Sequence, residues 1–591
     1  MTSRMPLYVS GRRRKMARTA NLSTVVLEGK GQVTLNAHAH VATGGEGSIY
    51  RVGDTGIKVY LDPDKIRREG LTEKVRLLSQ LRHPYIIAPQ GVVTTTAGVP
   101  VGFYMPFADG EPLPRLFTND FRRQVGFTDT DATVLVSGMR DGVQFAHDHQ
   151  AIMVDGNELN YLGMLSKKRA PEPRFIDVDS WTIGRWQSKA IMLSIRDWHS
   201  KSFTPLTDWF SWGIVTFQLY TGIHPYKGRL DGFDFGDFES RMKANASVFR
   251  KGIRLNTAVR DFSCIPSGLL QWYEAVFEKG ERTVPPSPFA TVQVPARART
   301  LRIVTSGKGT LVFEKLLERT NDEARCVFPC GVALFASGVL VDLLSKREIG
   351  STDPQTAEVV RVEDGWLIAS GCGKQMRAQY VDYVSHAEQN VALPVAGERF
   401  VRYENRLFVV TERGLTELVL KLFGKPLIAV GQTWGAMPLS TRWFDGCGIQ
   451  DTLGATYIVA PYGDAMCAHV RVRELDGVVP VAAKAGNHFI AVVGMDRTGA
   501  YRKYEFTLNK DYDAYILWQG KADGPELNMA VLARGVCATI VEDGRLIIFV
   551  PSTGAKTDVR DVHIATDMTL FADTDRVVYT REGAVWSVRM K

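Results

Sequence analysis

Four polar residues have the types that phosphoryl transfer needs. Lys58 lies in Gly56-Ile57-Lys58-Val59, Asp155 and Asn160 lie five residues apart, and Asp177 lies in Phe175-Ile176-Asp177. A lysine on a strand can neutralise phosphate charge, and an aspartate can accept the proton of a hydroxyl group. Asparagine and a second aspartate offer the oxygen ligands that Mg²⁺ prefers. Each residue alone is commonplace, so their order along the chain carries the prediction.

A glycine-rich segment precedes Lys58. It reads Ala42-Thr43-Gly44-Gly45-Glu46-Gly47-Ser48. Glycines in a turn between two strands let backbone N–H groups approach phosphates, because no side chain blocks them. A glycine-rich hairpin by itself is more often an ordinary turn. Followed by Lys58, Asp155, Asn160 and Asp177 at sensible spacing, it predicts a nucleotide site.

The elements that must position these residues follow from hydrophobic periodicity. We expect strands over 33–35, 48–52, 57–60, 91–93 and 102–105. Leu71, Val75 and Leu78 have helical spacing within an expected helix over 67–81. Further helices are expected over 132–147 and 209–221. The pattern indicates a small strand-rich lobe that carries Lys58, then a larger helical lobe that carries the other three residues.

The pattern changes beyond residue 300 to short β-rich runs separated by turn residues. A cluster of prolines, Pro285, Pro286, Pro288 and Pro295, marks the boundary. The clearest runs are 366–369, 407–411, 457–460, 489–493, 546–550 and 577–580. Their irregular spacing is compatible with four-stranded blades of ~40–45 residues. Six or seven such blades would fill the segment, which favours a β-propeller over tandem sandwiches, although no WD or kelch signature is present.

Composition excludes several classes of protein. The chain has 591 residues, 45% hydrophobic and 23% charged, which is typical of a multidomain soluble protein. No stretch approaches the ~18 apolar residues of a membrane span. The net charge is +8, yet the first 20 residues hold six basic residues and no acidic one. A nucleic-acid partner is therefore not expected beyond this arm, which is either a flexible tail or a contact with phosphates or a membrane surface. Met16 could be the true start. Seven scattered cysteines favour the cytoplasm.

Residues 33–290 resemble the eukaryotic-type Ser/Thr protein kinases of bacteria and phages. The similarity rests on the Gly-Gly-Glu-Gly loop, the D-x-N-E-x-N loop at Asp155 and the D-x-D-S motif at Asp177. Further matches are His83-Pro84, Thr207-Asp208-Trp209 and Gly280-Glu281-Arg282. The resemblance covers under half of the chain. It implies ATP and Mg²⁺ as cofactors and Ser or Thr hydroxyls as acceptors.

The resemblance also implies roles for individual residues. Asp155 would be the catalytic base, Lys58 would bind the α and β phosphates, and Asn160 and Asp177 would hold Mg²⁺. Glu73 would pair with Lys58, with Glu69 as the alternative. The remaining nucleotide-binding positions would be Gly44, Gly45 and Gly47 over the phosphates, the gatekeeper Met105, and the hinge residues Phe107 and Ala108. Asp208 and Arg282 would be structural.

Several positions depart from the kinase pattern. Ala42 replaces the first loop glycine, Val154 replaces an arginine that clamps a phosphorylated segment, and Asn157 replaces a lysine near the transferring phosphate. Asp179 replaces the glycine of D-F-G. These departures predict weaker or differently regulated catalysis.

The sequence thus predicts a multidomain α+β and all-β chain. Residues 1–30 form a basic flexible arm, 31–120 a kinase N-lobe, 121–295 a kinase C-lobe and 296–591 a six- or seven-bladed β-propeller. The predicted activity is protein serine/threonine phosphorylation, with the β domain recruiting a protein substrate or partner. The alternatives are a pseudokinase scaffold that binds nucleotide, and a virion- or complex-associated interaction protein.

Overall fold

The computed structural model describes residues 8–10, 24–166, 169–188, 191–234, 236–256, 258–290, 301–302, 311–463, 465–522, 524–541, 544–561, 563–565 and 567–590. The six basic residues within residues 1–20 and Pro295 lie outside these ranges. Among the described helices, none is both long and apolar enough to cross a membrane.

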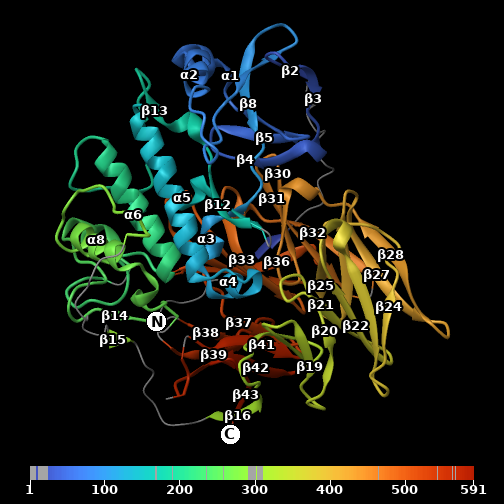
Figure 1. Cartoon of the computed structure of the whole chain (residues 1–591). Helices are drawn as coiled ribbons and strands as arrows, with labels where there is room; N and C mark the ends of the chain where they lie inside the picture. Colours follow the sequence, from blue (N-terminus) through green and yellow to red (C-terminus); the bar gives the residue numbers. More distant parts are fainter. Residues whose placement is uncertain are drawn as a thin grey trace.

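The N-terminal part of the chain is a seven-stranded antiparallel sheet, drawn in blue at the top of Figure 1. Its strand order is β3-β2-β7-β8-β6-β5-β4. The strands are β2 (Thr24–Leu27), β3 (Gly31–Thr34), β4 (His40–Thr43), β5 (Gly47–Val52), β6 (Thr55–Tyr60), β7 (Gly91–Thr95) and β8 (Pro100–Pro106). Because β2 pairs with β7, this N-terminal sheet already includes residues that we expected in the arm.

Two short helices stand where one helix was expected over 67–81. They are α1 (Pro63–Glu69) and α2 (Leu71–Leu78), separated by Gly70. Gly70 has φ 62°, a left-handed conformation that ends helices and is cheap only for glycine. The expected apolar positions of α2 are nevertheless buried, since helical spacing persists after the break.

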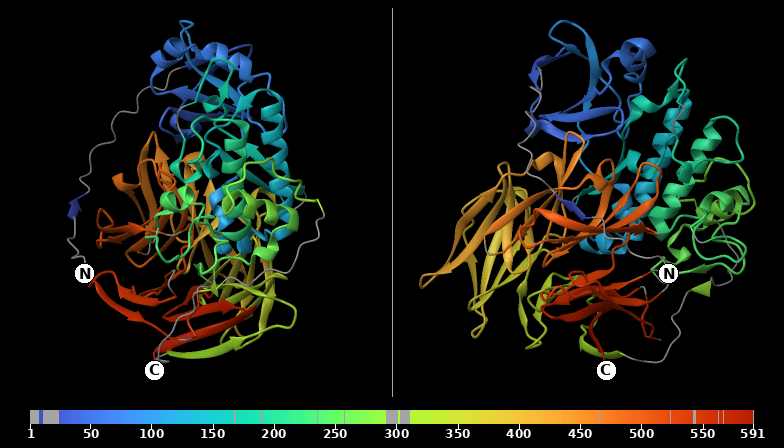
Figure 2. Two further views of the ribbon diagram at one scale, coloured as in Figure 1. Left: turned by 90° about the vertical axis from the view of Figure 1, so that its left-hand side faces the viewer. Right: turned by 180° about the vertical axis from the view of Figure 1, so that it is seen from behind.

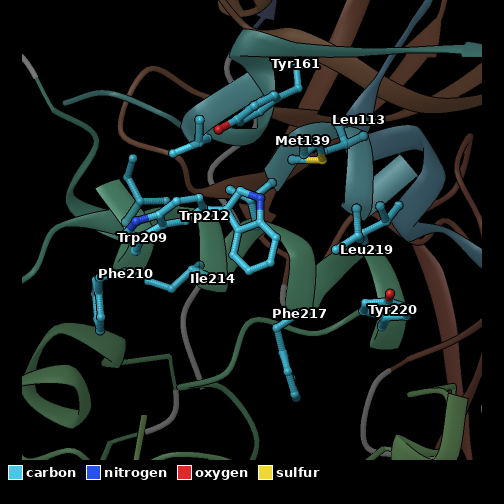
Figure 3. Packing of buried hydrophobic residues seen from close by; sticks show 14 of the residues in the cluster. Leu113, Met139, Tyr161, Trp209, Phe210, Trp212, Ile214, Phe217, Leu219 and Tyr220 are labelled. Atoms are coloured by element: carbon cyan, nitrogen blue, oxygen red, sulfur yellow. The ribbon is translucent and has the colours of Figure 1, made fainter. Parts of the chain in front are cut away.

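The helical region, residues 111–290, packs around one apolar cluster. Its helices are α3 (Leu113–Phe117), α4 (Asn119–Val125), α5 (Asp129–Asp148), α6 (Pro205–Thr221), α7 (Phe238–Lys243) and α8 (Ser267–Phe277). Every residue of α6 from Thr207 onward is buried, so this helix is surrounded by protein. Figure 3 shows Trp209, Trp212 and Phe217 of α6 among the residues of the cluster.

Short strands connect the helices. They are β9 (Glu111–Pro112), β10 (Ala151–Ile152), β11 (Tyr161–Ser166), β12 (Arg169–Phe175), β13 (Thr182–Ile183), β14 (Arg254–Leu255) and β15 (Leu301–Arg302). The β11–β12 hairpin separates the two acidic loops of interest, because Tyr161 pairs with Phe175 at its open end.

The described strands between 311 and 590 form seven antiparallel sheets of four strands, which we call the C-terminal domain. The first three sheets contain β17 (Ala324–Phe328), β18 (Val332–Phe335), β19 (Val339–Asp342) and β20 (Glu348–Ser351); β21 (Glu358–Val362), β22 (Gly365–Ser370), β23 (Arg377–Asp382) and β24 (Glu388–Val391); and β25 (Arg399–Tyr403), β26 (Arg406–Thr411), β27 (Gly414–Leu422) and β28 (Pro426–Trp434). The next three contain β29 (Thr441–Trp443), β30 (Gly448–Thr452), β31 (Ala455–Tyr462) and β32 (Met466–Arg471); β33 (Val479–Gly486), β34 (Phe489–Met495), β35 (Tyr501–Leu508) and β36 (Ala514–Lys521); and β37 (Met529–Val531), β38 (Cys537–Ile540), β39 (Leu546–Val550) and β40 (Ala555–Val559). Strand β1 (Tyr8–Ser10) extends the fifth sheet by pairing with β36.

The seventh sheet joins the two ends of the C-terminal domain. It consists of β16 (Leu311–Leu317), β43 (Ala584–Met590), β42 (Arg576–Arg581) and β41 (Thr569–Asp573), in that order. Strand β17 of the first sheet contacts β21 of the second and β41 of the seventh. Figures 1 and 2 show the sheets beside and below the helical region.

Candidate active site

Lys58 lies in the centre of the N-terminal sheet and forms the core of the site. It is on β6, between Ile49 of β5 and Phe103 of β8. Its Nζ lies 2.7 Å from Oδ1 of Asp177 and 2.8 Å from each carboxylate oxygen of Asp179. Burial by itself would lower the pKa of Lys58, but the two carboxylates outweigh it and raise the pKa. Lys58 is therefore a buried cation at the junction of the sheet and the helical region.

Asp179 is the most enclosed member of this group, with a side chain 4% exposed. Its carboxylate accepts a hydrogen bond from the Tyr60 hydroxyl at 2.8 Å as well as those from Lys58. Its backbone carbonyl accepts a bond from Nζ of Lys74 at 2.6 Å. Burial raises the pKa of Asp179, whereas the positive charge of Lys58 lowers the pKa of the more exposed Asp177. Asp177 is thus the carboxylate better suited to face a ligand.

Neither glutamate that we expected beside Lys58 is there. Glu73 bonds to Arg185 at 2.6 Å, and both side chains are about two-thirds exposed, 65% and 66%. Glu69 contributes its backbone carbonyl to the Trp186 indole N–H. The residue of α2 that faces the site is Lys74, which is 6% exposed. Helix α2 begins after the break at Gly70, its Lys74 contacts the carbonyl of Asp179, and Asp179 lies beside Lys58.

The glycine-rich segment forms the tip of the β4–β5 hairpin. The N–H of Gly44 donates to the carbonyl of Gly47 at 2.9 Å, which closes the turn. A Cβ on Gly47 would lie 2.8 Å from the carbonyl oxygen of Val59, so only glycine allows β5 to lie this close to β6. A Cβ on Gly45 would meet nothing within 4 Å. Gly44 and Gly45 therefore leave open space where a phosphate group could approach the backbone.

The loop that carries Asp155 is held by hydrogen bonds to Asp208 of α6. Asp208 is 2% exposed, and its carboxylate accepts bonds from the N–H of Met153 at 2.7 Å and of Val154 at 2.9 Å. His147 at the end of α5 contacts the same carboxylate at 3.0 Å. Two N–H groups that donate to one buried carboxylate fix the backbone immediately before Asp155.

Asp155 and Asn160 are joined within this loop. The side-chain amide of Asn160 donates to the carbonyl of Asp155 at 2.8 Å. The carboxylate of Asp155 accepts the N–H of Met192 at 2.9 Å, and burial raises its pKa. A carboxylate with a raised pKa is a stronger base than an exposed one, which suits proton abstraction.

Asn160 and Asp177 lie side by side at the open end of the β11–β12 hairpin. The N–H of Ile176 donates to the carbonyl of Asn160 at 3.0 Å, and Asp177 is the next residue. Asp177 has φ 58°, so its backbone turns sharply there. Because the amide nitrogen of Asn160 is engaged with Asp155, its oxygen Oδ1 is the atom left for a cation. One carboxylate and one amide oxygen fit Mg²⁺, which takes few protein ligands and completes its shell with phosphate and water. Among the described residues, no three His, Cys, Asp or Glu side chains gather as an alternative centre.

The expected hinge follows β8, which pairs with β6 on the side opposite the glycine-rich β4–β5 hairpin. Met105 pairs with Gly56 of β6, and a Cβ on Gly56 would touch the Met105 side chain at 3.5 Å. The N–H of Phe107 donates to the carbonyl of Asp54 at 2.9 Å, and the guanidinium of Arg51 lies over the Phe107 ring. Ala108 follows, partly exposed. The structure therefore places the predicted lysine, glycines, hinge and acidic loops around one junction, and it places Glu73 beside Arg185, away from Lys58.

The sequence reasoning missed Tyr60 and Lys74 as contacts of the site. Tyr60 is two residues after Lys58 on the same strand, so strand alternation places both on one face. That signal was available. No sequence signal pointed to Lys74, because the expected single helix over 67–81 did not include the break at Gly70 that precedes α2.

Comparisons with known proteins add little. No family model matches the chain, and no curated protein matches it. A similar solved structure is a twitchin kinase fragment from C. elegans, described as autoregulated protein kinase and immunoglobulin domains. The match has 16% sequence identity and a TM-score of 0.34, and it covers 42% of this chain and 56% of that one.

Proposed function

We propose that this chain is an ATP- and Mg²⁺-dependent protein kinase that transfers the γ-phosphate to Ser or Thr hydroxyls. The observation that carries the proposal is the joint placement of Lys58, Asp177, Asn160 and Asp155 at one junction. Lys58 contacts Asp177 at 2.7 Å, and Asn160 bonds to Asp155 while its backbone lies beside Asp177. A scaffold without chemistry has no need for all four.

Each residue of the chain has a defined task in this proposal. Lys58 binds the α and β phosphates, and the backbone from Gly44 to Gly47 covers them. Oδ1 of Asn160 and the carboxylate of Asp177 hold the metal, and Asp155 accepts the proton of the acceptor hydroxyl. The bound metal and nucleotide supply charge neutralisation and the phosphoryl group. Asp208 keeps the Asp155 loop in place, which preserves the alignment of base and acceptor.

We further propose that Asp179 replaces the helix glutamate of other kinases as the ion-pair partner of Lys58. It lies 2.8 Å from Nζ, and it is itself fixed by Tyr60 and by the Lys74 contact to its carbonyl. This role would account for an aspartate where the kinase pattern has glycine, and for the exposed position of Glu73.

We propose that the C-terminal domain is a seven-bladed β-propeller. Seven four-stranded antiparallel sheets support this, as does the seventh sheet, in which β16 from the start of the domain pairs with β43 from its end. Such closure ties the termini of a ring together and removes an open edge.

The test is transfer of radiolabelled γ-phosphate in the presence of Mg²⁺, with autophosphorylation and a basic acceptor protein as readouts. We expect Asp155→Asn to reduce incorporation by about 10²–10⁴-fold, the usual effect of losing a catalytic base. Asp141→Asn, an exposed aspartate on α5, is the matched control and should leave the rate unchanged. Equal rates for wild type and Asp155→Asn would contradict the proposal.

A nucleotide-binding scaffold is the second candidate, favoured by one observation. Oδ1 of Asp155 already accepts the Met192 N–H, so the base is partly occupied. Nucleotide that raises the melting temperature without any label transfer would favour the scaffold, because a ligand stabilises the fold that binds it.

A further inference from the structure

The C-terminal domain contacts the proposed kinase beside the Asp155 loop, where Leu159 packs on it. One such contact is made by the turn Asp496–Ala500 between β34 and β35, which lies against the segment from Met192 to Ser194. A Cβ added to Gly499 would lie 2.9 Å from Sδ of Met192 and 3.2 Å from Cβ of Ser194, and it would collide with the Ser194 hydroxyl. The turn and the segment are therefore packed without space between them.

This contact is apolar and continues to the Asp155 loop. Leu159 and Met192 both pack on a cluster of the C-terminal domain that includes Phe489, Met495 and Tyr501. Tyr501 is 3% exposed, and the Lys227 ammonium lies 5.5 Å from its ring centroid. Apolar residues from both sides form one cluster, as in a domain core, so the C-terminal domain and the helical region are packed together.

The same domain also reaches the N-terminal sheet and the segment that follows the hinge. Nε2 of His40 lies 3.9 Å from Oδ1 of Asp451, beside the glycine-rich hairpin. A Cβ on Gly454 would be 3.5 Å from Thr43.

After the hinge, the guanidinium of Arg115 lies over the Phe444 ring, and the charges of Arg115 and Arg442 outweigh burial and lower the pKa of Glu111. Contacts on both sides of the junction restrain the N-terminal sheet relative to the helical region.

The docked segment is also the one that occupies the proposed base. The N–H of Met192 donates to Asp155, and two residues later Ser194 meets Gly499. The carbonyl of Ser194 in turn accepts a bond from the buried His224 at 2.8 Å. The turn around Gly499 therefore packs against the segment Met192–Ser194, and the same segment donates a hydrogen bond to Asp155.

We infer that the C-terminal domain closes the acceptor side of the active site, so that phosphorylation of another protein requires this docking contact to open. The inference rests on the proposed kinase function. It assigns the domain an intramolecular partner, the segment Met192–Ser194, in the closed state.

The first experiment wedges the contact open. Gly499→Val places a branched side chain against Met192 and Ser194. Gly424→Val is the matched control, because Gly424 has a similar φ (72° against 79°) and a Cβ there would meet nothing within 4 Å. We expect Gly499→Val to raise amide hydrogen exchange of Met192–Arg196 at least tenfold and transfer to a basic acceptor protein at least fivefold. Gly424→Val should change neither.

The second experiment locks the contact closed and does not depend on the wedge. In Ser194→Cys/Gly499→Cys the Cβ atoms would be about 3.2 Å apart, just below the ~3.5–4.5 Å of disulfides. We expect oxidation to reduce transfer at least tenfold and reductant to restore it, with each single cysteine variant unaffected by oxidation.

Two failures are distinguishable. Equal transfer by the oxidised and reduced double variant would overturn the inference and leave the kinase proposal intact. Absence of transfer in every variant, although Gly499→Val opens the segment, would overturn the kinase proposal and this inference with it.

Discussion

Nζ of Lys58 lies 2.8 Å from both carboxylate oxygens of Asp179, a residue 121 positions later in the chain. The contact joins β6 to the turn after β12. Asp177 shares the same ammonium group but remains the more exposed of the two carboxylates, 40% against 4%. Lys58 can therefore remain paired with Asp179 when the carboxylate of Asp177 binds a metal ion.

Asp179→Asn should therefore impair phosphate transfer. The substitution removes the charge that orients Lys58 but retains the side-chain shape. We expect at least a tenfold fall in kcat with a smaller change in nucleotide affinity, measured by the γ-phosphate assay and by titration of a fluorescent nucleotide. Asp179→Glu should recover part of the rate, because it restores the charge.

Glu73→Gln is the matched control for that prediction. Glu73 pairs with Arg185 on the surface, where such pairs contribute about 0–1 kcal/mol. We expect a rate within twofold of the wild type. A tenfold loss would mean that α2 rotates to bring Glu73 to Lys58 during the reaction, and Asp179 would lose its proposed role.

The N-terminal half shows what sequence can and cannot predict. The order of Lys58, Asp155, Asn160 and Asp177, with the kinase resemblance that it supports, predicted that they meet; Lys58 lies within a strand, and the other three lie in turns next to short strands. The partner of Lys58 could not be predicted, since we expected one continuous helix over 67–81 and the structure has two, separated at Gly70. After this break, Lys74 contacts the site, whereas Glu73 pairs with Arg185 on the surface.

Asp208→Asn tests the anchor beneath Asp155. The buried carboxylate accepts two backbone N–H groups and contacts His147, and bonds to a charged group are worth about 1.5–3 kcal/mol each. We expect a loss of about 2–4 kcal/mol in unfolding free energy from urea denaturation. Asp109→Asn removes an exposed pair with Arg51 and should cost under about 1 kcal/mol.

The same substitution should slow transfer even at temperatures where the variant stays folded, because the loop at Met153 and Val154 loses its support. An Asp208→Asn protein with full stability would show that other contacts fix this loop.

His224 predicts a loss of stability in acid. It is 4% exposed; Nδ1 accepts the Tyr226 N–H and Nε2 donates to the Ser194 carbonyl, so the ring is neutral. Burial lowers its pKa to about 3, with Lys227 and Arg241 adding to the shift. In the unfolded chain the pKa of His224 is about 6.5, so between about pH 6.5 and 3 the unfolded chain binds a proton there and the folded chain does not. Stability is therefore complete above pH 6.5 and falls as the pH drops from there toward 3.

His224→Gln isolates this effect, because glutamine can still donate to Ser194 but does not titrate. Between pH 7 and pH 5 the wild type should lose about 2 kcal/mol more than the variant in urea unfolding. Parallel pH profiles for the two proteins would show that His224 is protonated in the fold.

The C-terminal domain illustrates a different limit of sequence reasoning. All six runs expected as strands fall within observed strands, and 546–550 matches β39 at both ends. They are inner strands such as β22, in which every residue is buried. Edge strands such as β24 and β40 were missed because they are mostly exposed and carry no continuous apolar run.

Tyr501→Phe should strengthen the contact between the C-terminal domain and the helical region. Among the described residues, the buried Tyr501 hydroxyl has no hydrogen-bond partner. Burial and the negative charge of Glu158 raise its pKa. An unsatisfied buried polar group costs about 1–3 kcal/mol, which phenylalanine would avoid at equal shape. We expect a higher melting temperature and slower hydrogen exchange in Met192–Arg196. Tyr515→Phe in the adjacent strand β36 is the opposite case, because that hydroxyl donates to Glu474 at 2.7 Å. It should lower the melting temperature, and equal shifts for the two variants would show that the Tyr501 hydroxyl is satisfied in solution.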